Sequence, residues 1–247
     1  MEKYLVMNNT LTIPRFAFGT FQVEDDQAET IIGKALEVGY RHFDCAWIYQ
    51  NEKSIGDVLA KNINQGKIQR SDLFLTGKLW CSFHKYERVR EQCLMSIENL
   101  QCEYLDLFLI HWPFAFVDQV NIKTFVFLNS TKKIVLFEDP RSTNECSIEI
   151  DDSIDFIETW KAMELLVDDG LVKSLGLSNF NEEQIQRILN ICKHKPVVNQ
   201  VEIQPYCPQY ELEEFCRQHE ILLEAFGPLG KFNRFFSNLM LLKRTLI

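Results

Sequence analysis

The sequence predicts an α/β protein built as a parallel (β/α)8 barrel. Strand-like apolar runs alternate with amphipathic helical segments, which indicates βα units around a parallel sheet. Three of the runs end at polar residues, namely Asp44, Lys78 and His111. Because side chains at the carboxyl ends of barrel strands converge on one mouth, we expect these groups to share a site. The 247 residues, 46% of them hydrophobic, are enough for one large core, so we expect a single domain over residues 1–247.

The expected strands follow a short N-terminal hairpin. We place this hairpin from Leu5 to Pro14, with its turn at Asn8-Asn9. Seven barrel strands are then recognised rather than eight, so the predicted barrel is incomplete. They lie near Arg15–Phe18, Tyr40–Asp44, Leu73–Thr76, Tyr104–Ile110, Val172–Leu177, Val197–Ile203 and Ile221–Phe226.

Helical periodicity is clear in two of the segments between the strands. Apolar residues recur there at i, i+3, i+4 and i+7, which predicts helices that pack on the barrel through Ala28, Ile31, Ile32 and Ala35, and through Ile185, Ile188, Leu189 and Cys192. Asn181 with Gln184 three residues later predicts a capping box at the start of the second helix. Pro208 is expected at the first position of a later helix.

One connection is too long for a simple βα turn. It runs from Pro113 to Asp152, and we expect it to line the barrel mouth as a long loop over residues 113–152. Its apolar runs Thr124–Leu128 and Lys133–Phe137 flank Asn129-Ser130, which predicts an added hairpin.

Composition excludes several classes of function. A net charge of −9 argues against nucleic acid as a partner, because such a surface needs a basic face. The eight cysteines include no C-x-x-C pair, so neither a zinc site nor a thioredoxin-type motif is indicated, and we expect no metal. No run of about 18 apolar residues or secretory leader is present, so we expect a cytoplasmic protein without membrane contact.

The residues around Asp44 carry a resemblance to a known family. The spacing D-x-A-x-x-Y-x-N-E from Asp44 to Glu52, followed by G-K-L-W at 77–80 and L-I-H-W-P at 109–113, resembles the aldo-keto reductase family. The resemblance runs from Leu11 to about Gly230. It implies a TIM-type barrel that uses NADP(H) to reduce aldehydes or ketones to alcohols.

The resemblance also implies roles for four residues. Tyr49 matches the general acid, Lys78 the cation that tunes it, Asp44 the partner of the lysine, and His111 the group that orients the carbonyl. Elementary chemistry agrees, since a phenol with a pKa near 10 is a reluctant acid and a nearby cation would lower that pKa. A lysine inside the mouth needs an anion to keep its proton, and Asp44 can supply it. Taken singly, each residue has an ordinary structural explanation: a helix cap, a half-buried helix residue, a solvated charge and a core imidazole.

Further positions resemble the cofactor and substrate contacts of the family. The G-x-S-N-F sequence at 176–180 supplies Ser178 and Asn179, which with Gln200 would bind the nicotinamide carboxamide, while Phe226 would stack on the ring beside Asp44. The other cofactor contacts implied are Gly19, Thr20, Phe21, Gly227 and Leu229. Trp80 and Trp112 would form apolar walls for a carbonyl substrate that also contacts Tyr49 and His111; the alternative for these tryptophans is simple core filling.

The resemblance ends near Gly230. Residues 231–247 form a divergent tail without the I-P-K-S strand and the R-x-x-E-N sequence that in the family hold the adenosine 2′-phosphate, and the C-terminal substrate loop is missing. Seven strands would leave two open edges, which favour self-association. Two functions therefore stay open: an NADP(H)-dependent carbonyl reductase with activity impaired by truncation, or a catalytically inactive barrel that acts as a binding or regulatory protein.

Overall fold

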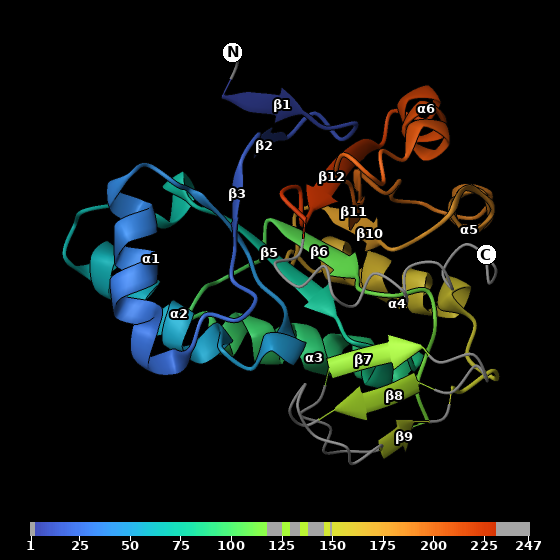
Figure 1. Ribbon diagram of the computed structural model, residues 1–247, viewed down its shortest axis with the longest axis horizontal. Coiled ribbons are helices and arrows are strands. Elements are labelled where there is room, and N and C mark those ends of the chain that lie inside the picture. Colours follow the sequence, from blue (N-terminus) through green and yellow to red (C-terminus); the bar gives the residue numbers. More distant parts are fainter. Residues whose placement is uncertain (1–2, 118–124, 129–133, 138–145, 149, 231–247) are drawn as a thin grey trace.

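A seven-stranded parallel sheet flanked by helices dominates the computed structural model, which describes residues 3–117, 125–128, 134–137, 146–148 and 150–230 (Figure 1). The sheet order is β12-β11-β10-β6-β5-β4-β3, so consecutive barrel strands are neighbours, as in a (β/α)8 barrel. The strands are β3 (Ala17–Gly19), β4 (His42–Asp44), β5 (Phe74–Leu79), β6 (Leu107–Ile110), β10 (Leu175–Ser178), β11 (Val198–Glu202) and β12 (Leu222–Phe226). All seven predicted strands are confirmed, with ends shifted by at most a few residues. The predicted tail, residues 231–247, lies outside the described residues.

The N-terminal hairpin is also confirmed, and it closes one end of the barrel sheet. Its strands β1 (Tyr4–Val6) and β2 (Thr12–Pro14) pair antiparallel with Leu5 opposite Ile13. Ile13 and the neighbouring Met7 are buried in a small apolar cluster with strand residues Phe74, Leu107, Leu109, Val197 and Val198. The amide of Asn8 in the turn donates to the carbonyl of Pro196, at 2.8 Å, which fastens the hairpin to the loop before β11.

In the described part of the chain, six α-helices and four short 3-10 helices connect the strands. They are α1 (Ala28–Glu37), α2 (Glu52–Asn64), α3 (Tyr86–Asn99), α4 (Phe156–Asp168), α5 (Glu182–Leu189), α6 (Tyr210–Gln218), η1 (Asp25–Gln27), η2 (Trp47–Tyr49), η3 (Arg70–Asp72) and η4 (Cys81–Phe83). The predicted capping box of α5 is confirmed, because Asn181 and Gln184 exchange side-chain to backbone bonds of 2.9 and 3.1 Å. The prediction for Pro208 is wrong, because α6 begins at Tyr210. Gln209 stands between them with a left-handed φ of 58°, which is not helical, so Pro208 lies before the helix rather than at its first position.

The long connection after β6 contains the predicted hairpin. Strands β7 (Phe125–Leu128) and β8 (Ile134–Phe137) pair antiparallel, and β9 (Cys146–Ile148) adds a third strand to this small sheet, which is separate from the barrel sheet (Figure 1). A bridge between Phe116 and Ile150 joins the two ends of the connection.

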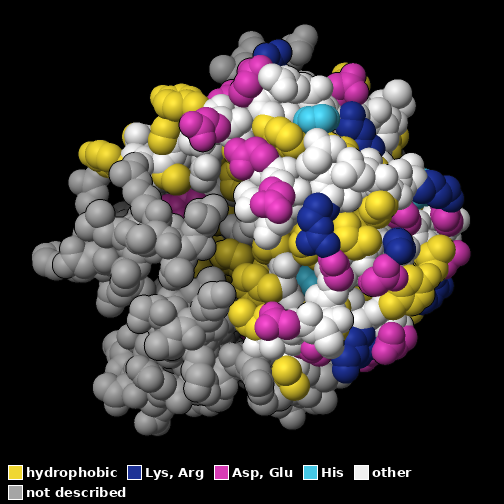
Figure 2. All heavy atoms as spheres, turned by 90° about the vertical axis from the view of Figure 1, so that its right-hand side faces the viewer, with side chains coloured by type: hydrophobic (Ala, Val, Ile, Leu, Met, Phe, Trp, Pro, Cys, Tyr) yellow, Lys and Arg dark blue, Asp and Glu magenta, His cyan; other side chains and the backbone are white. Residues whose placement is uncertain are grey.

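The described surface carries both signs of charge. On the face formed by the right-hand side of Figure 1, acidic and basic side chains are interspersed rather than separated by sign (Figure 2). Arg187 pairs with Asp155, and Lys193 with Asp168. Within the part of the chain that the structure describes, no helix is long and apolar enough to span a bilayer, and no group of three His, Cys, Asp or Glu residues is placed to hold a metal ion.

Close packing between α2 and α3 depends on Gly56. A Cβ atom built on this buried glycine would lie 2.2 Å from the carbonyl oxygen of Asn99 and 2.8 Å from the Cα atom of Leu100. Both are backbone atoms at the end of α3, so they cannot move aside as a flexible side chain would.

We therefore expect Gly56→Ala to lower the free energy of unfolding by about 1–3 kcal/mol or more, the usual cost of overpacking. Gly33 in α1 is the matched control, since a Cβ atom there meets nothing within 4 Å. Gly33→Ala should leave stability unchanged or raise it by about 0.5–1 kcal/mol, because alanine is the better helix former. Urea denaturation measures both variants, and equal stability of the two would refute the packing argument.

Candidate active site

A buried ion pair joins the carboxyl ends of β4 and β5. Asp44 is the last residue of β4, and Lys78 lies near the end of β5. The Nζ atom of Lys78 is 2.8 and 2.7 Å from the two carboxylate oxygens of Asp44 and donates a third bond of 3.1 Å to the carbonyl of Cys45. Lys78 is 0% and Asp44 9% exposed, so the pair lies inside the barrel rather than in open solvent.

The charge of Lys78 depends on this partner. Burial by itself would lower the pKa of the ammonium group, but the negative charge of Asp44 and the hydrogen bond to it raise that pKa above its ordinary value. Lys78 is therefore protonated throughout the physiological range, as expected for a lysine paired with Asp44.

Tyr49 lies in η2, directly after β4, and its hydroxyl oxygen is 3.4 Å from the Nζ atom of Lys78. Burial raises the pKa of this phenol above 10 and outweighs the cation of Lys78, which lowers that pKa as expected. Tyr49 consequently keeps its proton near neutral pH, so its hydroxyl can donate a hydrogen bond.

His111 follows β6 and lies beside Tyr49. The two rings are nearly perpendicular, with centroids 6.0 Å apart. Burial and then the charge of Lys78 lower the pKa of His111 well below its usual value, so the imidazole is neutral. A phenol and a neutral imidazole side by side can donate two hydrogen bonds to one substrate oxygen.

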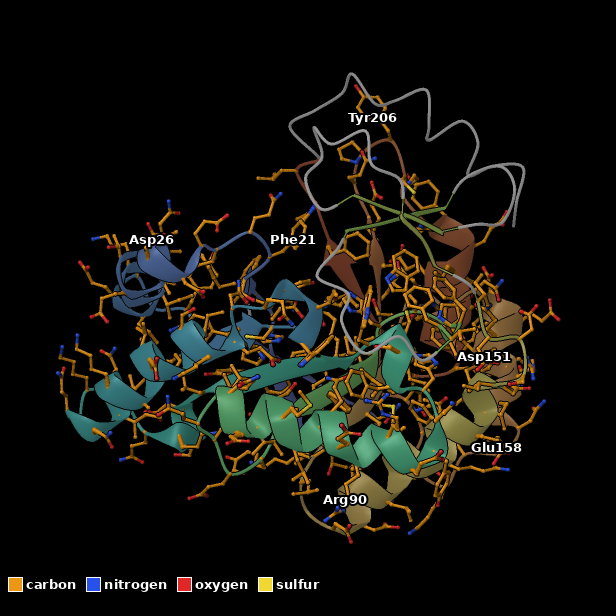
Figure 3. The ribbon with its side chains drawn as sticks, turned by 90° about the horizontal axis from the view of Figure 1, so that it is seen from below. Phe21, Asp26, Arg90, Asp151, Glu158 and Tyr206 are labelled. Atoms are coloured by element: carbon orange, nitrogen blue, oxygen red, sulfur yellow. The ribbon has the colours of Figure 1, made fainter. Side chains whose placement is uncertain are left out.

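Aromatic side chains surround these two donors. Trp80 is buried, and its ring lies edge-on to that of His111 with ring centroids 5.4 Å apart. Trp112 stacks on Phe114 with ring centroids 5.7 Å apart. Phe21 is 46% exposed, and its ring contacts Tyr49 at 5.1 Å from the loop after β3, where Figure 3 labels it. The polar centre is therefore bordered by flat apolar surfaces.

Three amide and hydroxyl groups extend the site toward β10 and β11. Ser178 ends β10 and donates to the carbonyl of Gln200 in β11, at 2.9 Å. The amide nitrogen of Asn179 donates to the carbonyl of His111, at 2.9 Å, and to the hydroxyl of Ser178, at 3.1 Å. Asn179 has a φ of 66°, a left-handed conformation that asparagine tolerates better than most residues.

Gln200 connects this group to the ion pair. Its amide nitrogen donates to Asp44 and to Glu224 on β12, at 3.0 Å each. The nitrogens of both amides thus donate to protein acceptors, while the Oδ1 atom of Asn179 and the Oε1 atom of Gln200 have no donor among the described residues. Two such acceptors match the two N–H bonds of a carboxamide.

The other positions expected to bind the cofactor differ in exposure. Thr20, after Gly19, is buried, and its hydroxyl donates to the carbonyl of Asp44, at 2.9 Å, so it supports the loop rather than facing solvent. Phe226 is half-buried at the end of β12. Gly227, with a φ of 58°, and Leu229, which is 99% exposed, follow it outside the polar centre.

Two residues without a role predicted from the sequence, Asn51 and Glu224, also take part in this network. Asn51 donates to the carbonyls of Thr20 and Val23, at 2.8 and 2.9 Å, which holds the loop after β3 against η2. Glu224 accepts from Gln200. The signal for Glu224 was available, because residues two apart on a strand share a face and Phe226 had been placed in the site.

Comparison with known proteins gives one consistent result. A family model described as "Aldo/keto reductase family" matches residues 15–236. Over 95% of its length, this chain is 44% identical to aldose reductase C of Dictyostelium discoideum and 40% identical to aldo-keto reductase family 1 member A1-A of Danio rerio. It is also 40% identical, over 94% of its length, to glycerol 2-dehydrogenase (NADP(+)) of Hypocrea jecorina. The matches cover 67–70% of these three relatives.

The buried ion pair gives a prediction about stability. Lys78→Met leaves the Asp44 carboxylate buried without its cation, so the free energy of unfolding should fall by about 3–5 kcal/mol. Adding Asp44→Asn removes the uncompensated charge and should recover part of that loss. Urea denaturation of the wild type, both single variants and the double variant measures the coupling. Additive single effects would show that the two charges do not depend on each other.

Proposed function

The chain belongs to the aldo/keto reductase family, and we propose that it is an NADP(H)-dependent oxidoreductase that reduces aldehyde or ketone carbonyls to alcohols. The observation that carries the proposal is the convergence of Asp44, Lys78, Tyr49 and His111 in one polar centre with aromatic walls. A nicotinamide cofactor is supported further by the name of the Hypocrea jecorina relative.

The described residues fit the nicotinamide end of such a cofactor. The two amide oxygens of Asn179 and Gln200 can accept from the carboxamide, and Phe226 offers an aromatic face to the ring. When bound, the reduced cofactor supplies the hydride that adds to the carbonyl carbon. Gly19 at the end of β3 and Phe21 in the loop after it would border the same cofactor, while the buried hydroxyl of Thr20 holds this loop to the carbonyl of Asp44.

The residues of the polar centre would handle the carbonyl oxygen. As the carbon accepts hydride, the electron pair of the C=O π bond moves to oxygen, which takes the proton of Tyr49. His111 donates a hydrogen bond that orients the same oxygen, and the ammonium of Lys78 stabilises the phenolate left on Tyr49. Solvent then returns a proton to Tyr49. Trp80 and Trp112 would contact the apolar part of the substrate, which favours aliphatic and aromatic carbonyl compounds.

Titration with NADPH, followed by quenching of tryptophan fluorescence, tests the cofactor assignment. Saturable quenching supports a reductase. Absence of binding would instead favour the alternative, a catalytically inactive barrel that binds or regulates a partner.

Replacement of Tyr49 tests the acid role. Tyr49→Phe keeps the ring but removes the proton donor, so reduction of an aromatic aldehyde by NADPH should fall by about 10²–10⁴, the usual contribution of positioned proton transfer. Cofactor affinity should change little, because the ring beside Phe21 is retained. Tyr40→Phe is the matched control, since Tyr40 packs edge-on against Phe18 at 5.5 Å and has no part in the polar centre. Unchanged turnover in Tyr49→Phe would remove this residue from the acid role.

A further inference from the structure

Glu224 is a second carboxylate next to the buried ion pair. It lies directly opposite Gln200 in the register of β11 and β12, and its Oε1 atom accepts the 3.0 Å bond from the Gln200 amide. The other oxygen, Oε2, is buried and has no hydrogen-bond partner among the described residues. Because buried polar atoms are almost always bonded, an orphaned carboxylate oxygen inside the barrel indicates that a partner binds there.

The charge balance around Glu224 is negative when it is ionised. Asp44 on β4 reaches it through the shared amide of Gln200, and Lys78 on β5 is the nearby cation. Tyr49 lies beyond Lys78, and Glu202 is two residues farther along β11. Among Asp44, Glu224 and Lys78, one ammonium group therefore serves two carboxylates, so these three groups have one unbalanced negative charge when both carboxylates are ionised.

Strand geometry places this charge beside the proposed nicotinamide position. Glu224 and Phe226 are two residues apart on β12 and so share a face. They lie opposite Gln200 and Glu202 in the register. A ring that stacks on Phe226 and binds the Oε1 atom of Gln200 therefore lies next to Glu224. A nicotinamide ring is positively charged when oxidised and neutral when reduced.

We propose that Glu224 discriminates between the redox states of the cofactor, because its carboxylate stabilises the positive ring of the oxidised form and not the neutral ring of the reduced form. The inference rests on the proposed function, since it requires a nicotinamide at this site. Glu224 touches no reacting carbonyl in this scheme. It acts on the equilibrium between the two bound nucleotides.

Proton linkage gives the expected direction with pH. Burial and then the charge of Asp44 raise the pKa of Glu224 from 4.5 to about 7, while Lys78 and Gln200 oppose the rise. A positive ring within about 4–6 Å favours the ionised carboxylate and lowers this pKa again. Oxidised nucleotide should therefore release protons from Glu224 as it binds near pH 7, and its affinity should rise from pH 6 to pH 8. Reduced nucleotide should release no proton from this group.

Isothermal titration calorimetry of NADP+ and NADPH tests the inference on the wild type and on Glu224→Gln, which keeps the shape and the acceptor oxygen but loses the charge. At pH 8 the variant should bind NADP+ about tenfold more weakly than the wild type does, which corresponds to a fall of about one unit in the pKa of Glu224 on binding. The affinity for NADPH should change by less than about threefold. Measurement in two buffers of different ionisation enthalpy counts the protons released. The number of protons released with NADPH is subtracted from the number released with NADP+, and this difference cancels the contribution of the nucleotide phosphates. Glu213→Gln on the exposed face of α6 is the control, because it makes the same change in net charge.

The outcomes are distinct. A ratio of NADP+ to NADPH affinity that is equal in the wild type and Glu224→Gln would overturn the role of Glu224 and leave the proposed function standing. Failure of the wild type to bind either nucleotide would overturn both.

A measurement without cofactor checks the titration itself. The folded-state pKa of Glu224 is above the unfolded value, so its stabilising contribution is complete below about pH 4.5 and is lost as pH rises through about 7. The difference in unfolding free energy between Glu224→Gln and the wild type should therefore grow across this window in favour of the variant. A difference that does not vary with pH would contradict a buried, titrating Glu224.

Discussion

The buried pair of Lys78 and Asp44 is the interaction on which the rest of the site depends. Removing two charges from water is costly, and the cost is offset only when the charges meet in good geometry with their remaining bonds satisfied. Here Asp44 accepts both short contacts from Lys78 and one from Gln200, while Lys78 also reaches Cys45 and Tyr49. Strands β4, β5 and β11 are thereby held at fixed separations at their carboxyl ends. Tyr49 contacts Lys78, and His111 contacts Tyr49, so the ion pair helps to position both side chains.

A second constraint is the way the amides are oriented. The amide nitrogens of Asn179 and Gln200 both donate to protein oxygens. These partners are carbonyl or carboxylate oxygens about 3 Å away, which accept hydrogen bonds only from a donor, so the amide atom facing each of them is the nitrogen. Their oxygens remain for a ligand. Because the amide nitrogens are already bonded, the free oxygens favour a ligand that donates hydrogen bonds. The amides hold this orientation before a ligand binds, so binding needs little reorganisation.

Sequence predicted the strands well because parallel strands buried on both faces appear as continuous apolar runs. The cap at Asn181 was predictable because its bonds are local. Pro208 was misplaced, since a left-handed Gln209 between proline and helix leaves no simple sequence pattern. The direction of the Tyr49 pKa was also missed, because the depth of burial, which outweighs Lys78, is a property of the folded chain. The face of Glu224 could be read from its spacing to Phe226, but its bond to Gln200 could not, because that bond comes from the register between β11 and β12, which the sequence does not record.

The hydrogen bonds from the hairpin turn to distant residues affect the order in which the chain can fold during its synthesis. Asn8 bonds to the carbonyls of Pro196 and Glu220, which are 188 and 212 residues farther along the sequence. On the ribosome, the first fourteen residues are synthesised early but cannot reach these acceptors until nearly the whole barrel has emerged. Contacts of such high sequence separation are slow to form, and intermediates that lack them expose apolar surface. The apolar cluster around Met7 and Ile13 is likewise completed only when Val197 and Val198 have been synthesised, so this end of the barrel is closed late.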